Sequence, residues 1–239
     1  IEVDDSAGRP LSILPPGTLL LALAEAAAQG LAPLALLALV KHPLVDGGMG
    51  RLAWLDGVRA LDLMLRGPRP PAGLEGLDGQ IGAGEAARWW RTARPLFEPI
   101  AAAFARGSQP LASLVAVLRE TVQALAGDAV WSGPAGRAAA ELLTELEADA
   151  DAGPPLVDPA ELAPMLRTLA DELVVRLPPG QRHPRLAIYG LVEARLQATD
   201  LMILGGLNEG VWPGRPAPDP WLAPRIRAEL GLPGLERRI

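Results

Sequence analysis

Apolar side chains recur every three or four positions over most of the first 176 residues, which predicts amphipathic helices rather than strands. Glycine is favoured just after a helix and proline in its first turn, so Gly30 is expected to end the first helix and Pro33 to begin the second. The third helix is expected to bury its apolar positions at 52, 55, 58, 61 and 65. The expected helices cover residues 18–29, 33–42, 49–65, 85–106, 111–126, 135–150 and 158–176.

Prolines and glycines mark the places where this pattern stops. Residues 66–84 contain Pro70-Pro71 followed by five glycines, and consecutive prolines exclude a helix, so a loop is expected there. Pro95 and Pro99 are expected to interrupt the helix over 85–106. The clearest helix start is Asp158-Pro159-Ala160-Glu161, with an N-cap aspartate, a proline at the first helical position and a glutamate three residues after the cap.

The helical pattern gives way to short apolar runs near residues 180–185. Leu186–Tyr189 and Leu201–Leu204 are runs of the length typical of buried strands. Asp219-Pro220 is expected to begin a last helix, which Gly231 ends. The predicted fold class is therefore α+β and mainly α, with a helical part first and an α/β part after it.

The amino-acid composition excludes several kinds of functional site. The 239 residues contain no cysteine, which excludes a disulfide, a thiolate zinc site, an iron–sulfur cluster and a cysteine nucleophile. The two histidines, His42 and His183, cannot form a histidine-rich metal site alone, and His42 is expected to be a structural residue at a helix end. The single lysine, Lys41, does not follow a glycine-rich loop, so there is no Walker A phosphate site. No metal or cofactor is expected.

Charged residues are distributed unevenly. The net charge is −6, but residues 119–175 hold 11 acids against 3 arginines, a net −8, while residues 51–106 hold 8 arginines against 6 acids. The acidic part is expected to be a solvated face, and any contact with nucleic acid must be local. The most apolar region, residues 19–40, contains Glu25, Gln29 and Pro33, so buried helices in a cytoplasmic protein are expected rather than a membrane span.

One segment combines features that could carry a binding function. The run ending at Leu204 is followed by Gly205-Gly206, then by Asn208 and Glu209, and then by Trp212 before a proline. In open α/β sheets ligands bind beyond the carboxyl ends of strands, where these polar side chains would be presented. The alternative is a structural turn with left-handed glycines and Trp212 packed on the core.

This segment resembles the AddB subunits of bacterial AddAB helicase–nucleases, and more distantly RecC. Leu204-Gly205-Gly206-Leu207-Asn208-Glu209-Gly210-Val211-Trp212-Pro213 is similar to the AddB form of a strand and turn found in UvrD-like superfamily 1 helicases. Those helicases carry a Thr-x-His-x-Ala-Lys-Gly-Leu-Glu motif before the strand, of which this chain keeps only the Ala-Lys pair, as Ala194-Arg195. The resemblance implies a helicase-like domain without motor activity: an initial strand and turn at 1–16, a helical 2B-like insertion at 17–183 and a 2A-like α/β segment at 184–239.

The resemblance also implies a function in double-strand break repair and recombination. The chain would be a non-catalytic fragment of a longer protein that holds single-stranded DNA and contacts an AddA-type partner subunit. That partner carries the motor of an ATP-dependent helicase and exodeoxyribonuclease. The expected DNA contacts are Arg195, Asn208, Glu209 and Trp212, with Arg66 and Arg69 in the Pro/Gly loop as further candidates, although a solvated loop is the simpler reading of those two.

Other interpretations stay open at this point. The chain could be a purely structural protein–protein interaction module that docks through residues 85–180, or a fragment of an active superfamily 1 helicase, against which the missing motif residues argue. Trp89 and Trp90 could stack on bases. Because adjacent helical residues point in different directions, one of them is instead expected in the core and the other at the surface or in an interface.

Overall fold

The structure is a computed structural model that describes residues 8–68, 70–176, 187–190, 193–206, 208, 210, 214 and 221–232. The chain divides into two compact units, residues 1–182 and 183–239. The described part is mainly helical, as predicted. The first unit contains β1 Arg9–Pro10, η1 Leu11–Ile13, α1 Pro15–Ala28, α2 Pro33–Val40, α3 Arg51–Met64, α4 Leu74–Gln80, α5 Glu85–Phe104, α6 Leu111–Ala126, η2 Asp128–Trp131, α7 Gly133–Ala148, η3 Ala150–Ala152, α8 Pro159–Glu172 and β2 Val174–Val175. The second contains η4 Glu193–Leu196 and α9 Pro224–Glu229.

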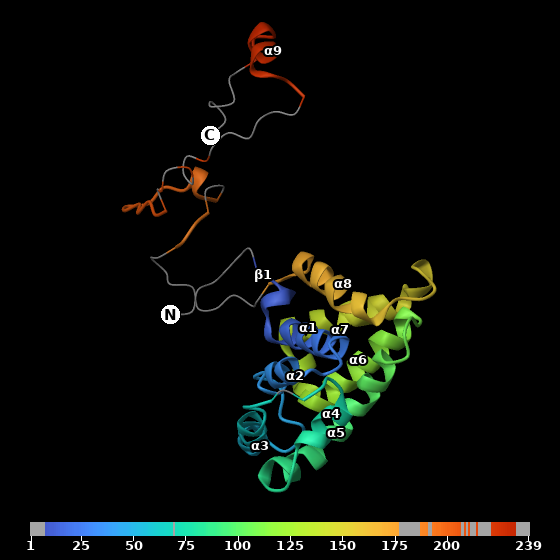
Figure 1. The fold of residues 1–239 in the computed structure, drawn as a ribbon. Helices are drawn as coiled ribbons and strands as arrows, with labels where there is room; N and C mark the ends of the chain where they lie inside the picture. The colour runs from blue at the N-terminus through green and yellow to red at the C-terminus, as the bar shows by residue number, and fades with distance from the viewer. Residues whose placement is uncertain are drawn as a thin grey trace. The chain divides into compact units, whose positions relative to one another are not determined.

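Helix α1 lies at the centre of the helical unit, where it contacts α2, α5, α6, α7 and α8 (Figure 1). Its sequence is apolar around the whole circumference, which is the pattern of a helix buried on every side. Leu19, Leu23 and Ala24 have no exposed surface. Gly30 ends this helix as predicted: it adopts φ +61°, and the N–H of Leu31 bonds to the carbonyl of Ala26 at 2.7 Å.

Three tryptophans cluster at the end of the unit where α3 packs on α5. Trp54 of α3 meets Trp89 of α5 edge-on, with ring centroids 4.9 Å apart, and Trp90 stacks on Phe97. The helices approach so closely because Gly57 of α3 has no side chain: a Cβ there would lie 2.1 Å from the Trp89 ring. Trp89 and Trp90 both belong to the buried core, so the expectation that only one of them does is wrong. Trp90 turns inward because its indole N–H donates to Asp78 of α4 at 2.7 Å.

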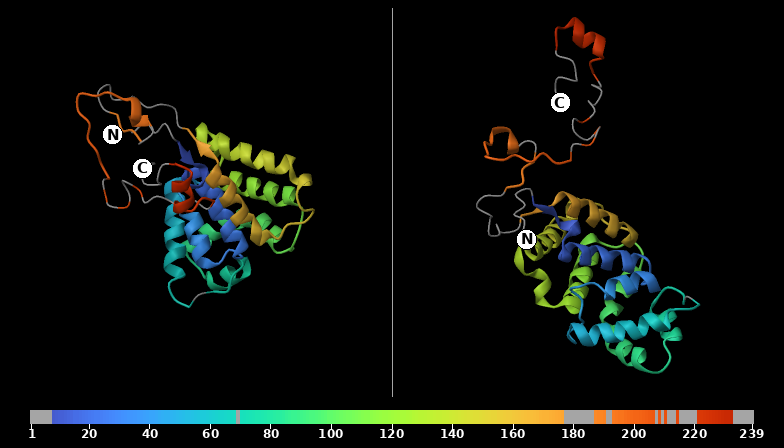
Figure 2. Two further views of the ribbon diagram at one scale, coloured as in Figure 1. Left: turned by 90° about the horizontal axis from the view of Figure 1, so that it is seen from above. Right: turned by 90° about the vertical axis from the view of Figure 1, so that its left-hand side faces the viewer.

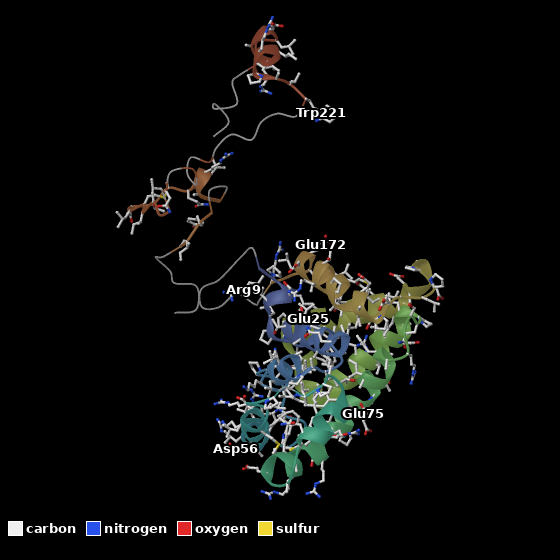
Figure 3. All side chains as sticks on the ribbon, in the orientation of Figure 1. Arg9, Glu25, Asp56, Glu75, Glu172 and Trp221 are labelled. Carbon is white, nitrogen blue, oxygen red and sulfur yellow. The ribbon has the colours of Figure 1, made fainter. Side chains whose placement is uncertain are left out.

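A two-residue antiparallel ladder joins the two ends of the helical unit. Arg9 pairs with Val175 and Pro10 with Val174, and the N–H of Leu11 donates to the carbonyl of Leu173 at 2.8 Å. This ladder lies beside α8, whereas α3, α4 and α5 lie at the other end of the unit (Figures 1 and 2). Figure 3 labels Arg9 and Glu172 at the first end, and Asp56 and Glu75 at the second. The chain therefore enters and leaves the helical unit at one point.

Several helix boundaries differ from those predicted. The expected loop over 66–84 contains α4, because burial of Leu74 and Leu77 compensates for its poor helix formers. Helix α5 continues through Pro95 and Pro99, both of which lie on its exposed face, where water can reach the carbonyls that lose a partner. Helix α8 ends at Glu172 rather than at residue 176, because the β-branched Val174–Val175 pairs with β1.

The buried face of α3 also differs in part. Leu52 was expected on it but is 78% exposed, while Trp54, Val58 and Leu61 have no exposed surface. Trp54 is two residues after Leu52, which is about 200° around the helix, so it points inward against Trp89 while Leu52 points outward.

The described residues of the second unit do not form the predicted buried strands. Residues 187–190 and 201–206 pair with no other described strand, and Ile188 and Ile203 are each 81% exposed. An apolar run becomes a strand only when neighbouring strands bind its backbone groups. The predicted strand at residues 1–3 and the predicted helix start at Asp219-Pro220 lie outside the described residues, and α9 begins at Pro224.

Candidate functional site

The turn after residue 204 has the glycine conformations that the sequence predicts. Gly206 and Gly210 adopt φ values of +70° and +79°, which residues with a Cβ rarely adopt. The N–H of Asn208 donates to the carbonyl of Gly206 at 2.8 Å, and the Asn208 side chain is exposed. Glu209 and Trp212, the other two predicted contacts in this turn, lie outside the described residues.

Arg195 lies on η4, a short helical turn that begins after Gly190. The N–H of Ala194 donates to the carbonyl of Gly190 at 3.0 Å, and the N–H of Gln197 donates to that of Ala194 at 3.2 Å. The Arg195 side chain is exposed and makes no hydrogen bond or ion pair with any described residue. Its guanidinium presents a planar set of donors that suits a phosphate.

Arg66 follows α3 in the first unit and is partly engaged. Its Nη2 lies 3.5 Å from Asp62 Oδ2, the same oxygen that Lys41 Nζ contacts at 2.9 Å. The hydrogen bond from Lys41 is the largest of the effects that lower the pKa of Asp62, and Arg66 adds to it. The shared carboxylate offsets part of the charge that Arg66 could offer a phosphate. Arg69 lies outside the described residues, and no hydrogen bond or ion pair between described residues joins the predicted contacts to one another.

His42 has a structural role, in line with its expected place at a helix end. The N–H of Leu44 donates to His42 Nδ1 at 3.3 Å, so the neutral ring carries its proton on Nε2, which lies 2.9 Å from Thr18 Oγ1. The Thr18 hydroxyl donates in turn to the carbonyl of Pro15 at 3.0 Å. Burial, and then the positive charge of Arg51, lower the pKa of His42 and keep the ring neutral.

A surface groove on the helical unit was not foreseen from the sequence. It has a volume of about 510 Å³ and lies between α8, the start of α6 and the segment 154–158. The only sequence signal was an apolar Leu156-Val157 pair inside a stretch otherwise typical of a loop. The groove could not be read from this pair, because its walls come from residues more than 40 positions apart.

The described part of the chain contains neither a cluster of metal-ligating side chains nor a candidate membrane span. No three acidic or histidine side chains gather there as a metal ion requires. Each helix described is too short or too polar to span a bilayer. No family model, curated protein or solved structure matches the chain.

Proposed function

We propose that the chain is a non-catalytic, helicase-like part of an AddB-type subunit, in which the helical unit is an insertion and the second unit contacts single-stranded DNA. The observation that carries the proposal is the β1–β2 ladder. A domain inserted into another must receive and return the chain at neighbouring positions, and the pair Arg9–Val175 satisfies this requirement.

Two further features support the DNA contact. Arg195 stands at the only position of the helicase Ala-Lys-Gly-Leu-Glu segment where a basic residue is retained, and its guanidinium is exposed. The neighbouring turn exposes Asn208 on a backbone that needs glycine, which lets a nucleic-acid strand approach closely. With no cofactor, the chain would hold DNA while an AddA-type partner subunit performs ATP hydrolysis and cleavage.

The test is binding of a fluorescent oligothymidylate by the whole chain at increasing salt. Each phosphate contact to a single strand contributes about −0.7 to the slope of log K against log salt, so two or three contacts predict a slope of about −1.4 to −2.1. Arg195→Ala should weaken binding and make the slope shallower by about 0.7, the share of one phosphate. Arg137→Ala, an exposed arginine on α7 without an ion pair to any described residue, is the matched control. Absence of binding at low salt, or equal effects of the two variants, would refute the DNA contact.

A second candidate function is a protein–protein interaction module. The acidic surplus of residues 119–175 and the groove beside α8 favour it, because both suit a protein partner better than a polyanion. It predicts a partner footprint within residues 85–180, seen as slowed hydrogen exchange, and no DNA binding at any salt. DNA binding that Arg195→Ala weakens would contradict this module as the sole function.

A further inference from the structure

The groove on the helical unit has apolar walls held in fixed positions. Leu111, Leu156 and Met165 line it, and Leu156 is 56% exposed. Gln109 and Val157 exchange two backbone hydrogen bonds, of 3.1 and 2.9 Å, which tie the wall containing Leu156 to the start of α6. The side chain of Asp158 accepts a bond of 2.9 Å from the N–H of Ala160 and fixes the same wall to α8. A surface of this kind needs little reordering before it binds.

Acidic side chains surround these apolar walls. Asp158, Glu161 and Thr168 supply the polar part of the lining, which contains no lysine or arginine. The two carboxylates exceed the roughly +0.5 charge of the N-terminus of α8, so this end of the groove is negative. Arg167, the one arginine of α8, is paired with Glu25 of α1.

The acidic rim continues along the helix. Glu161, Met165, Thr168 and Glu172 are spaced by four, three and four residues, so they lie on one face of α8. Figure 3 labels Glu172 at the end of this helix. Neither Glu161 nor Glu172 forms an ion pair with another described residue. From Glu161 to Glu172 the face is about 16 Å long, which is three turns of helix.

We propose that this groove binds an amphipathic helix of a partner protein, with apolar residues spaced three and four apart and lysines or arginines beside them. An apolar groove between a helix and a loop is a known way to hold the apolar face of such a segment, and Met165 adapts to its shape. The acidic rim excludes an acidic peptide or a nucleic-acid backbone, because like charges in contact repel. A wall as exposed as Leu156 cannot enclose a small molecule, which pockets cover over most of its surface.

This inference does not depend on the AddB-type proposal. The groove lies in the first unit, and the predicted DNA contacts Arg195 and Asn208 lie in the second. A chain that fails to bind DNA can still bind the helix, and peptide affinity should be unchanged in Arg195→Ala. Either proposal can therefore be refuted while the other still stands.

The test selects peptides without assuming their sequence. A phage library of random 16-residue peptides is selected on the whole chain, after depletion on a variant that carries Leu156→Ser and Glu161→Lys. Sixteen residues form a helix of about 24 Å, longer than the acidic face. Enriched peptides should carry net positive charge and apolar residues at i, i+3 or i+4, and i+7. The proposal is overturned if nothing survives depletion, or if the surviving peptides are acidic or lack this spacing.

Matched variants then locate the binding site. By fluorescence anisotropy, Leu156→Ser and Glu161→Lys should each raise the Kd of an enriched peptide about fivefold or more, as expected for a central apolar contact and a charge reversal. Leu63→Ser removes a side chain with 63% exposure on α3, and Glu141→Lys makes the same charge reversal on α7, outside the groove. Both controls should change Kd less than about twofold. A loss in Glu141→Lys equal to that in Glu161→Lys would assign the attraction to the general acidity of the unit and overturn the groove.

Discussion

The contact between Gly57 and Trp89 predicts a large effect of the smallest possible substitution. Gly57 lies inside α3, where alanine is normally the better helix former by about 1 kcal/mol. An alanine Cβ at this position would lie 2.1 Å from both Cγ and Cδ1 of Trp89. The indole cannot simply move away, because it is 6% exposed and also meets Trp54, which is itself packed closely against Gly47.

The net effect follows from two opposing terms. Overpacking a close-packed core costs about 1–3 kcal/mol, and a contact so far inside the van der Waals distance belongs at the upper end. Subtracting the gain in helix propensity leaves Gly57→Ala destabilised by about 2 kcal/mol. For a helical unit of this size that is a decrease in Tm of about 4–8 °C.

Gly79→Ala on α4 supplies the matched control. It makes the same chemical change inside a helix, but no atom lies within 4 Å of the new Cβ, so it should gain up to about 1 kcal/mol. Urea unfolding of both variants, followed by far-UV circular dichroism and tryptophan emission, measures the difference. If Gly57→Ala is as stable as the wild type, or gains stability as Gly79→Ala does, the close packing of α3 on α5 is refuted.

Three further predictions follow from local contacts. With His183→Gln as background, the free energy of unfolding should fall as the pH is lowered from 7.5 to 5.5. In the unfolded chain His42 binds a proton near pH 6.5, whereas in the folded chain its pKa is lowered, so protonation favours the unfolded chain. His42→Gln should remove this pH dependence when urea unfolding is measured over the same range. Asp158→Ala should lower the free energy of unfolding, measured by thermal denaturation, by about 1 kcal/mol because the N-cap hydrogen bond is lost, and Asp158→Asn should lower it much less. Equal losses in the two variants would show that Asp158 does not cap α8. A double-mutant cycle on Arg119 and Glu147, whose two hydrogen bonds of 3.1 and 2.9 Å join α6 to α7, should give a coupling below about 1 kcal/mol that 0.5 M salt reduces; a larger, salt-independent coupling would contradict a surface pair.

The sequence predicted those features whose causes are local. Gly30 ends α1 and Asp158 caps α8 because the backbone conformations they need are set within a few residues. The same holds for the left-handed glycines of the turn at 206–210. Each of these signals is complete within one short stretch of chain.

Features that depend on distant residues were not predictable in this way. Helix α4 has three glycines in or beside it and forms because Leu74 and Leu77 are buried. The end of α8 depends on β1, about 165 residues earlier in the chain. The burial of both Trp89 and Trp90 needed Asp78 as a partner for one indole and Gly57 as space for the other.

The candidate site also contains features that depend on nearby residues and features that depend on distant ones. Exposure of Arg195 and Asn208 follows from polar residues in turns, whereas burial of the run at 201–204 requires partner strands, and the sequence says nothing of where they come from. The groove beside α8 was missed entirely, because Leu111 and Met165 become neighbours only in the folded chain.

The β1–β2 ladder also determines how the helical unit responds to mechanical force. Arg9 and Val175 form its outermost pair. A force that separates the two chain segments flanking the helical unit therefore acts on the backbone hydrogen bonds of the ladder one after another, and not on all of them together. Pro10 has no N–H to contribute to the ladder, which leaves it weaker still. Tension between the flanking segments would therefore open the ladder first and then peel α8 from α1, while the tryptophan cluster at the far end stayed intact. The unit is built to yield at the point where it joins the rest of the chain.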